Sequence, residues 1–269
     1  MAERKNRNRN RERDFKEREF KTEERTDIII GRNPVIEALK SGREIEKIVI
    51  ADGAEGSVSK IAGMARDRGI VIHYNNRAYF EKTAGGKNHQ GVIAFVAAHK
   101  YSEMEDIFAK AEKSGEPPFI IILDNLEDPH NLGAVMRTAE CAGAHGVIIP
   151  KRRAVGLTET VAKAAAGALE YIPCVKVANI AQTIDKLKEK GLWIAACDMG
   201  GTEYYRQDLT GSIAVVIGSE GNGISRLVKE KCDFVVSMPM VGRINSLNAS
   251  NAAAVIMYEV RKQRDVKKL

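Results

Sequence analysis

The chain has 269 residues, of which 44% are hydrophobic, and it carries a formal net charge of +6 at pH 7. This length can bury a full core in one or two domains, and the composition is ordinary for a globular protein. No apolar run approaches the roughly 20 residues of a membrane helix and no apolar signal core follows the charged N-terminus, so we expect a cytoplasmic protein.

Neither the cysteines nor the histidines show a metal-binding spacing. The four cysteines lie far apart without a CxxC pair, and the five histidines form no HxxxH pattern. We therefore expect no metal site and no disulfide framework, but buried free thiols in a reducing compartment. The net positive charge is a modest indication of a polyanionic partner.

Residues 1–26 hold ten Lys or Arg against seven Asp or Glu, with few apolar side chains. Such a segment cannot bury enough apolar surface to fold alone. We predict a basic, disordered tail, which is either an arm that binds nucleic acid or a solvated segment without a specific role.

Residues 27–98 are predicted to form a small α/β sandwich domain, because strand and helix patterns alternate in them. His89 and Gln90 either contact a substrate or shape the loop before the last strand. The predicted elements, in chain order, are strand 28–30, helix 35–40, strand 45–50, helix 57–68, strand 70–74, a short helix around Phe80 and strand 92–98.

Residues 99–117 are predicted to be a linker with a helix at 101–113, because Ser114-Gly115-Glu116-Pro117-Pro118 breaks the pattern. From residue 118 to 264, apolar strands alternate with helices, which predicts a mostly parallel sheet covered on both faces. Residues 265–269 are expected to form a C-terminal tail. The strands are predicted at 119–124, 146–150, 171–177, 192–198, 213–218 and 234–238, and the helices at 132–142, 158–169, 180–190, 224–231 and 252–260.

Three polar loops follow predicted strands, and parallel sheets bind ligands at such carboxyl ends. We call them the first loop (residues 124–131), the second loop (218–223) and the third loop (238–250). Asn131 of the first loop is placed to cap a helix. Arg137, six residues later, either clamps a phosphate or forms a surface salt bridge.

The second loop lacks the GK[ST] ending of a phosphate loop and the glycine spacing of a dinucleotide fingerprint. A nucleoside lying on glycine backbone is compatible with it. Glu220 either orients a hydroxyl group or is a charge favoured at a helix start. The third loop joins a short strand to a helix rich in small residues. This arrangement either holds a ligand against backbone N–H groups or caps the helix with Ser or Asn.

Together the three loops resemble one family. Asn125–Ala139 meets the string NxxDPxNxGxxxRTA, Ile217–Ser225 meets IGxEGxG(I/M)S, and Pro239–Ala254 meets PMxGxxxSLNxSxAAA, which Val255 and Ile256 follow. These are similar to the three motifs of the SpoU (TrmH-type) RNA ribose 2′-O-methyltransferases of the SPOUT superfamily. Residues 31–39 and 89–91 resemble the substrate-binding domain that precedes many of them. The combination is most similar to the RlmB-type enzymes, which methylate a guanosine in 23S rRNA.

The resemblance implies a parallel-sheet SPOUT domain whose C-terminal segment forms a trefoil knot. It also implies a homodimer with both active sites at the subunit interface, an RNA partner (23S rRNA or a pre-ribosomal particle) and S-adenosylmethionine as methyl donor. The residues that it implies for binding the donor are Ile217, Gly218, Glu220, Gly221, Met238, Pro239, Met240, Leu247 and Ala249. The residues that it implies for catalysis are Asn131, Arg137, Glu220, Ser246 and Asn248.

In the implied reaction the ribose 2′-hydroxyl attacks the sulfonium methyl in line, and no metal is required. Holding the oxygen and the methyl carbon in a near-attack geometry should supply most of the rate gain. Because arginine stays protonated, we expect Arg137 to clamp the adjacent phosphate and to stabilise the developing alkoxide. The proton would leave to phosphate or water.

Three other functions stay open at this stage. They are a tRNA 2′-O-methyltransferase of the same family, an RNA-binding protein that kept the fold without catalysis, and a nicotinamide or nucleotide enzyme on a doubly wound sheet. The intact set of implied catalytic residues argues against the second function. The missing glycine fingerprint at the first turn argues against the third.

Overall fold

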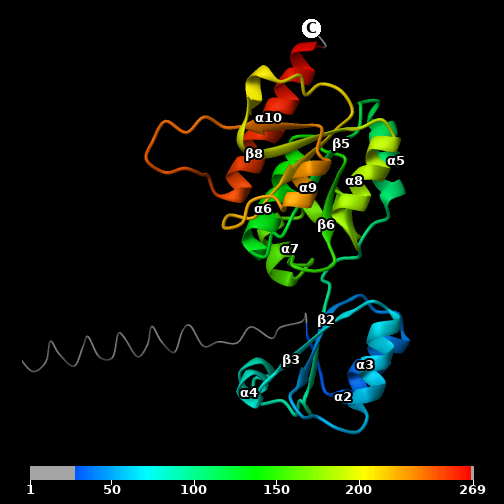
Figure 1. Cartoon of the computed structure of the whole chain (residues 1–269). Coiled ribbons are helices and arrows are strands. Elements are labelled where there is room, and N and C mark those ends of the chain that lie inside the picture. The colour runs from blue at the N-terminus through cyan, green and yellow to red at the C-terminus, as the bar shows by residue number, and fades with distance from the viewer. Residues whose placement is uncertain (1–27, 268–269) are drawn as a thin grey trace, which may run out of the picture. The chain divides into compact units, whose positions relative to one another are not determined.

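The computed structural model describes residues 28–267, so the predicted basic tail 1–26 lies outside the described residues. The chain folds as two compact units that divide between Val96 and Ala97 (Figure 1). Helix α5 (Met104–Ser114) lies in the predicted linker, and its Ile107 packs into the core of the second unit. The last helix, α10 (Ala249–Lys267), continues past residue 264, where the second domain was predicted to end.

The first unit is a four-stranded mixed sheet with helices on both faces. The strand order is β1-β4-β2-β3, in which β2 and β3 are parallel and β4 is antiparallel to β1 and β2. Neighbouring residues of β2 point to opposite faces, because Ile48 packs with α2 and α3 whereas Val49 packs with Phe80 of α4. The small α/β sandwich predicted for this region is therefore confirmed. Its elements are β1 (Ile28–Ile30), α2 (Arg32–Lys40), β2 (Ile45–Ala51), α3 (Val58–Asp67), β3 (Val71–Asn75), α4 (Arg77–Ala84) and β4 (Val92–Val96).

The second unit is built on six parallel strands in the order β10-β8-β9-β5-β6-β7. The central strands β5 and β9 are buried along their whole length, which is why they appear in the sequence as continuous apolar runs. The predicted parallel sheet is confirmed. Its strands are β5 (Phe119–Leu123), β6 (Gly146–Pro150), β7 (Cys174–Val177), β8 (Trp193–Glu203), β9 (Ile213–Ile217) and β10 (Phe234–Ser237).

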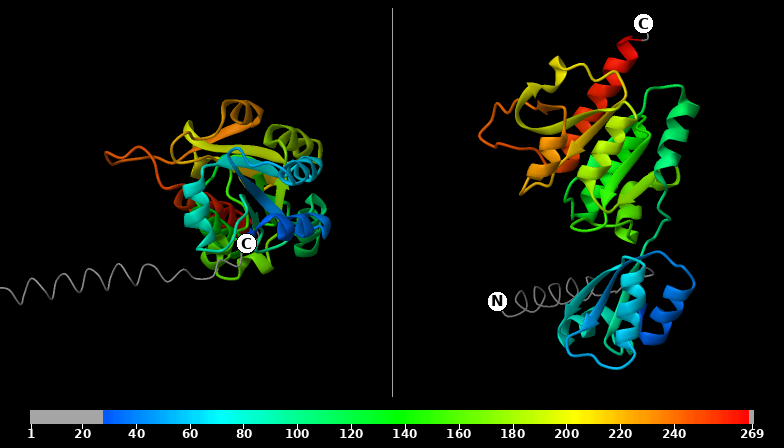
Figure 2. Two further views of the ribbon diagram at one scale, coloured as in Figure 1. Left: turned by 90° about the horizontal axis from the view of Figure 1, so that it is seen from below. Right: turned by 45° about the vertical axis from the view of Figure 1, so that its right-hand side comes forward.

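Helices cover both faces of this sheet, as two views show (Figures 1 and 2). One core holds apolar residues of α6, α7 and α10, and the other holds those of α5, α8 and α9. The trefoil knot stays a prediction from the resemblance. The remaining helices are α6 (Pro129–Cys141), α7 (Glu159–Ala165), α8 (Ile180–Glu189) and α9 (Arg226–Lys231), with short 3₁₀ turns at Ala168–Glu170 and Tyr204–Arg206.

Strand β8 is longer than predicted because it contains a bulge. Its pairing with β10 shifts between Val235, which faces Ala196, and Val236, which faces Thr202. The residues between Ala196 and Thr202 therefore have no partner in β10, although Cys197 still pairs with Ile217 of β9. Bulges of this kind re-aim side chains beside functional sites.

The prediction that the cysteines are buried free thiols is only partly confirmed. All four are free thiols, but only Cys174 is buried, and Cys141 is exposed because it lies at the outward end of α6. Over residues 28–267, no helix is long and apolar enough to cross a membrane.

His145 fixes the amino end of the central sheet. Its Nδ1 accepts a hydrogen bond from the Phe119 N–H at 2.9 Å, and its Nε2 lies 2.9 Å from Ser114 Oγ. Burial, and then the positive charges of Arg264 and Lys110, lower the pKa of His145 to about 4. The imidazole is therefore neutral in the folded protein at pH 5, whereas in the unfolded chain it is mostly protonated.

Lowering the pH from 7 to 5 should therefore destabilise the second unit by about 2 kcal/mol through His145 alone, because the unfolded state binds the extra proton. In His145→Gln this part of the pH dependence should disappear. The measurement is urea unfolding at both pH values, followed by the fluorescence of Trp193, the only tryptophan. His73→Gln, at an exposed histidine of the first unit, is the control. A His145→Gln protein that keeps the full wild-type loss would contradict this role.

Candidate active site at the carboxyl edge of the second sheet

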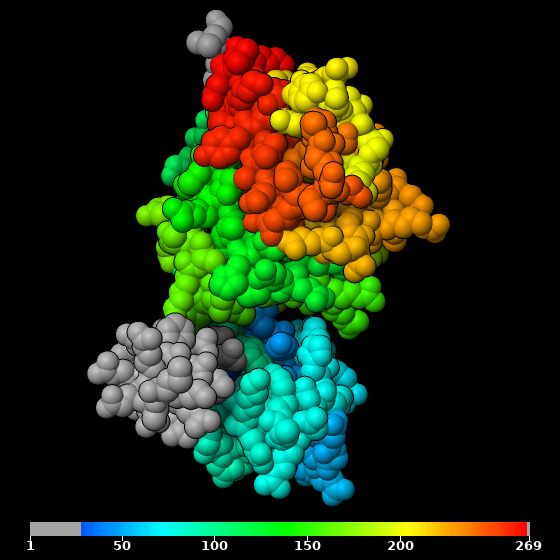
Figure 3. All heavy atoms as spheres, turned by 90° about the vertical axis from the view of Figure 1, so that its left-hand side faces the viewer, coloured from blue at the N-terminus to red at the C-terminus, as the bar shows by residue number. Residues whose placement is uncertain are grey.

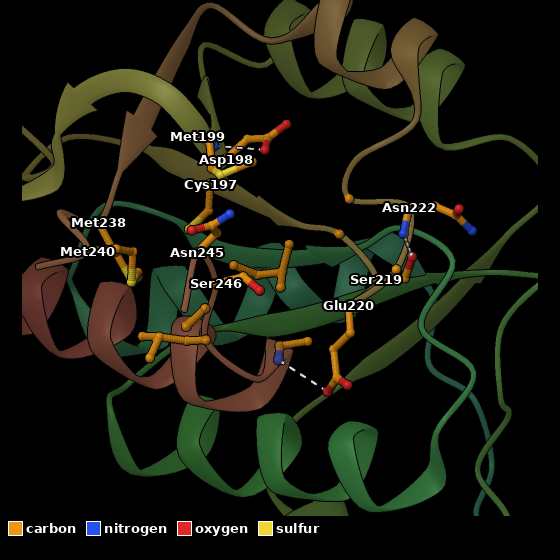
Figure 4. Close-up of a pocket in the computed structure, with 17 residues that line it drawn as sticks. Cys197, Asp198, Met199, Ser219, Glu220, Asn222, Met238, Met240, Asn245 and Ser246 are labelled. Carbon is orange, nitrogen blue, oxygen red and sulfur yellow. Dashed lines mark hydrogen bonds between the residues drawn. The ribbon is translucent and has the colours of Figure 1, made fainter. Parts of the chain in front are cut away.

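A hollow of about 370 Å³ opens at the ends of β9 and β10 and beside the irregular middle of β8 (Figure 4). It lies at the carboxyl ends of parallel strands, as the sequence predicted. Eight of the nine residues implied to bind the methyl donor line it, and Pro239 does not. We call it the first hollow; it is lined by Cys197, Asp198, Met199, Ile217, Gly218, Ser219, Glu220, Gly221, Asn222, Gly223, Met238, Met240, Asn245, Ser246, Leu247, Ala249 and Ala252.

The second loop folds back on itself directly after the end of β9. Ser219 and Gly223 exchange two backbone hydrogen bonds of 3.2 and 2.9 Å. A Cβ atom at Gly218 would lie 2.2 Å from the carbonyl carbon of Gly223, so no larger residue fits there without moving the loop. The glycine is thus required because the backbone of Gly223 passes close to it.

Asp124 ties the start of α9, just after the second loop, to the end of β5. Its Oδ2 accepts a hydrogen bond from the Ser225 N–H at 2.7 Å, and its Oδ1 accepts one from Asn125 Nδ2 at 3.0 Å. Asp124 is almost completely buried, so both bonds are protected from water. The sequence did not single out Asp124 as a site residue, although a carboxylate directly after a buried strand was an available signal.

The first loop does not use Asn131 as the helix cap, so that prediction is wrong. Helix α6 begins at Pro129, and Asp128 caps it by accepting a hydrogen bond from the His130 N–H at 2.8 Å. Pro129 suits the first helical position, because its missing N–H would have no partner there. Asn131 therefore lies inside the first turn, buried, and its amide is available for contacts to the other loops.

Three side chains from the three loops meet at Glu220. Asn131 Nδ2 donates a hydrogen bond to Glu220 Oε1 at 2.9 Å, and Asn248 Nδ2 donates to the same oxygen. Asn248 Nδ2 also lies 3.0 Å from Asn131 Oδ1. The N–H of Ala249 points to Glu220 Oε1 from 3.5 Å. We call these three side chains the polar network.

Asn248 also caps α10, which confirms the capping reading of the third loop, while its ligand-binding reading stays a prediction. Its Oδ1 accepts hydrogen bonds from the Ser250 N–H at 2.9 Å and from the Ser250 hydroxyl at 2.6 Å. Its amide nitrogen faces the polar network. One side chain therefore fixes the start of α10 and joins it to the other two loops.

The other two implied catalytic residues lie differently. Ser246 lines the first hollow. Arg137 is exposed on α6, and within residues 28–267 no hydrogen bond or ion pair engages its guanidinium group. It lines neither the first hollow nor the one described next.

A second hollow, of about 640 Å³, adjoins the first. The two share a wall made by Ser219, Glu220, Gly221 and Asn222. Glu220 thus lies between them, held by the polar network. The other residues that line the second hollow are Asn125, Leu126, Glu127, Asp128, Asn131, Arg153 and Ser225.

Sequence reasoning missed the contribution of β8. Cys197, Asp198 and Met199 line the first hollow from the bulge in this strand (Figure 4). Burial, and then the nearby charge of Asp198, raise the pKa of Cys197 to about 11. The Cys197 thiol therefore stays protonated at neutral pH and is a poor nucleophile. Asn245, also missed, enters the lining from the third loop.

The described residues contain no group of three or more His, Cys, Asp and Glu side chains that could hold a metal ion. The hollow instead offers backbone groups, apolar walls and a few polar side chains. Such a lining suits an organic ligand.

Residues 118–258 match the SpoU rRNA Methylase family. Residues 28–102 match the family described as RNA 2′-O ribose methyltransferase substrate binding. The chain is also 50% identical over 241 residues to YacO of Bacillus subtilis (strain 168), which is named as a TrmH family tRNA/rRNA methyltransferase. That alignment covers 89% of this chain and 96% of YacO.

Solved structures with a similar fold come from the same group of proteins. The SpoU methyltransferase AviRb from Streptomyces viridochromogenes, in complex with the cofactor AdoMet, aligns with a TM-score of 0.58 at 23% identity, covering 89% of this chain and 90% of that one. The TrmH/SpoU tRNA modifying enzyme of A. aeolicus aligns with a TM-score of 0.52 at 26% identity, covering 61% and 85%. The two units of this chain and its parallel sheet agree with these matches. The chain belongs to the SpoU/TrmH family of RNA methyltransferases.

Proposed function

We propose that this RNA methyltransferase transfers a methyl group from S-adenosylmethionine to the ribose 2′-hydroxyl of a guanosine in 23S rRNA, in the cytoplasm. The observation that carries the proposal is the polar network, which joins the three motif loops between two adjoining hollows. The reacting oxygen and the methyl carbon must come into direct contact, and the adjoining position of the two hollows at Glu220 would allow this. The substrate-binding match of the first unit supports ribose as the acceptor.

The first hollow fits S-adenosylmethionine. Its volume of about 370 Å³ lies within the range of small-molecule sites. Apolar side chains such as Ile217, Met238 and Leu247 offer walls for a flat base. When bound, S-adenosylmethionine supplies a methyl group on a positively charged sulfonium. The Glu220 carboxylate at the shared wall favours a positive charge nearby.

The chain's own residues then hold the acceptor in place. The polar network fixes Glu220, whose second carboxylate oxygen can accept a hydrogen bond from a ribose hydroxyl. Ser246 lines the first hollow, where its hydroxyl can orient the ligand. Positioning of the reacting oxygen is expected to supply most of the rate gain.

Arg137 is proposed to bind the phosphate next to the reacting ribose and to stabilise the alkoxide that develops there. Its exposed guanidinium, without a partner in the described part of the chain, is free for such a contact. The proton would leave to that phosphate or to water, because arginine does not give up its own proton.

A homodimer with both active sites at the interface would explain why Arg137 lines neither hollow of its own chain. The third loop and α10 lie together on one face of the second unit (Figure 3). Large apolar side chains are exposed along them, and Val241 is 99% exposed. Exposed apolar clusters of this kind mark contact surfaces. The others are Met240, Ile244, Leu247, Val255 and Tyr258.

A tRNA 2′-O-methyltransferase is the second candidate, since the A. aeolicus neighbour is a tRNA modifying enzyme and YacO is named for both RNA classes. A non-catalytic RNA-binding protein is less well supported, because Asn131, Glu220 and Asn248 are joined in one intact network.

Gly218→Ala should lower the affinity for S-adenosylmethionine at least tenfold, because the added methyl group would displace the backbone at Gly223. Calorimetric titration measures the effect, and circular dichroism checks that the variant is folded. Gly211→Ala is the matched control, since its added Cβ meets nothing within 4 Å. Unchanged affinity in a folded Gly218→Ala protein would remove the second loop from the donor site.

Arg137→Ala should reduce the methylation rate by about 100-fold or more, the usual loss when a group that stabilises transition-state charge is removed. Affinity for S-adenosylmethionine should change by only a few fold. In a strain without the gene, ribose-methylation mapping should show one guanosine of 23S rRNA that loses its methyl group. The wild-type gene should restore it, the Arg137→Ala gene should not, and Arg226→Ala, at an exposed arginine of α9, should behave as wild type. Restoration by Arg137→Ala would exclude a catalytic role, and a loss confined to tRNA would favour the second candidate.

Ile244→Asp should convert the dimer into monomers, because it places a charge in the exposed apolar surface of the third loop. Sedimentation analysis measures the change. Leu227→Asp makes the same substitution at a 57% exposed residue of α9 and should leave the dimer intact. A monomeric wild-type protein would refute the proposed dimer.

A further inference from the structure

One cationic side chain lines the second hollow and has no protein partner among the described residues. Arg153 is the only Lys or Arg among the residues that line it. Its side chain is exposed, and no hydrogen bond or ion pair within residues 28–267 engages it. An arginine without a protein partner, in a hollow that adjoins the donor site, is suited to bind an anion from outside.

Most of the carboxylates that line the second hollow already accept hydrogen bonds from the protein. Asp128 accepts the hydrogen bond that caps α6, and Glu220 accepts those of the polar network. Only Glu127 has no hydrogen bond within the described residues. Arg153 therefore forms no ion pair with these three carboxylates, although their negative charges remain in the lining, and the amides and hydroxyls there can bind ribose or base edges.

The backbone at Arg153 has an unusual conformation that flanking hydrogen bonds hold in place. The residue has φ +56°, a left-handed conformation that few non-glycine residues adopt. Hydrogen bonds on both sides hold the segment, from the Lys151 N–H to the Val177 carbonyl and from the Val155 N–H to the Leu126 carbonyl. The second of these bonds joins it directly to the first loop. Its neighbour Arg152 is equally exposed but does not line the hollow.

We propose that the second hollow receives the RNA strand at the nucleotide to be methylated, and that Arg153 binds a phosphodiester beside that ribose. This inference rests on the proposed function and names the acceptor side of the same site. The strand would lie beside the donor, with the reacting hydroxyl reaching past Glu220 to the methyl group. Arg153 is a positioning residue, because a phosphate contact fixes register without reading sequence. Arg137 is also proposed to bind a phosphate next to this ribose, but it differs from Arg153 because it stabilises the developing alkoxide.

The test compares Arg153→Gln with Arg152→Gln, two variants of adjacent residues that remove the same charge and keep a similar stem. With unmodified 23S rRNA transcribed in vitro, Arg153→Gln should raise the Kd for RNA and the KM about tenfold. The rate at saturating RNA should stay within about threefold. The slope of log affinity against log salt should become shallower by about 0.7–0.9, the loss of one phosphate contact. Arg152→Gln should stay within twofold of wild type, and Arg153→Lys should recover most of the loss.

Equal effects of both glutamine variants, or none for Arg153→Gln, would overturn the assignment of the second hollow. The affinity for S-adenosylmethionine and the thermal stability of Arg153→Gln should not change. Unchanged values would show that the substitution has not distorted the loop. If the proposed function itself were wrong, the result would differ from these outcomes. The wild-type protein would then methylate no ribose in 23S rRNA.

Discussion

The carboxylate of Glu220 accepts hydrogen bonds from two side-chain amides that are far from it, and from each other, in the chain. Asn131 belongs to the helix after β5, and Asn248 begins the last helix. A hydrogen bond to a charged group contributes about 1.5–3 kcal/mol, and a partly buried carboxylate that loses a donor is destabilised by a similar amount. The three loops can therefore take up this arrangement only together. The shape of both hollows depends on it.

The parallel sheet makes this meeting possible. All six strands of the second unit point the same way, so the segments after β5, β8, β9 and β10 emerge at one edge. Asp124 strengthens the edge by holding the start of α9 to the end of β5. At the opposite edge, His145 and its partners fix the amino ends of the strands. A rigid sheet with adaptable loops at one edge is a suitable frame for precise positioning of two substrates.

Much of this was predictable from the sequence, and the misses have physical reasons. Continuous apolar runs such as Phe119–Leu123 predict buried parallel strands, and the motif strings single out Glu220 and Asn248. Periodicity could not predict the bulge that brings Asp198 into the first hollow, because its cause is a shift in pairing with β10, a strand distant in sequence. Asn131 was assigned the cap that Asp128 makes, since both residue types suit that position. Arg153 lay outside every motif, and only its φ angle and its place beside the first loop distinguish it from Arg152.

The most direct measurement is the identity of the nucleoside that the purified protein methylates. Unmodified 23S rRNA is incubated with the protein and S-adenosylmethionine that carries an isotopically labelled methyl group, then digested to nucleosides and analysed by mass spectrometry. If Glu220 and its partners place a ribose hydroxyl against the methyl group of the donor, the label should appear as 2′-O-methylguanosine. Label on a base, or on no nucleoside while the protein still binds S-adenosylmethionine, would contradict the proposed ribose transfer.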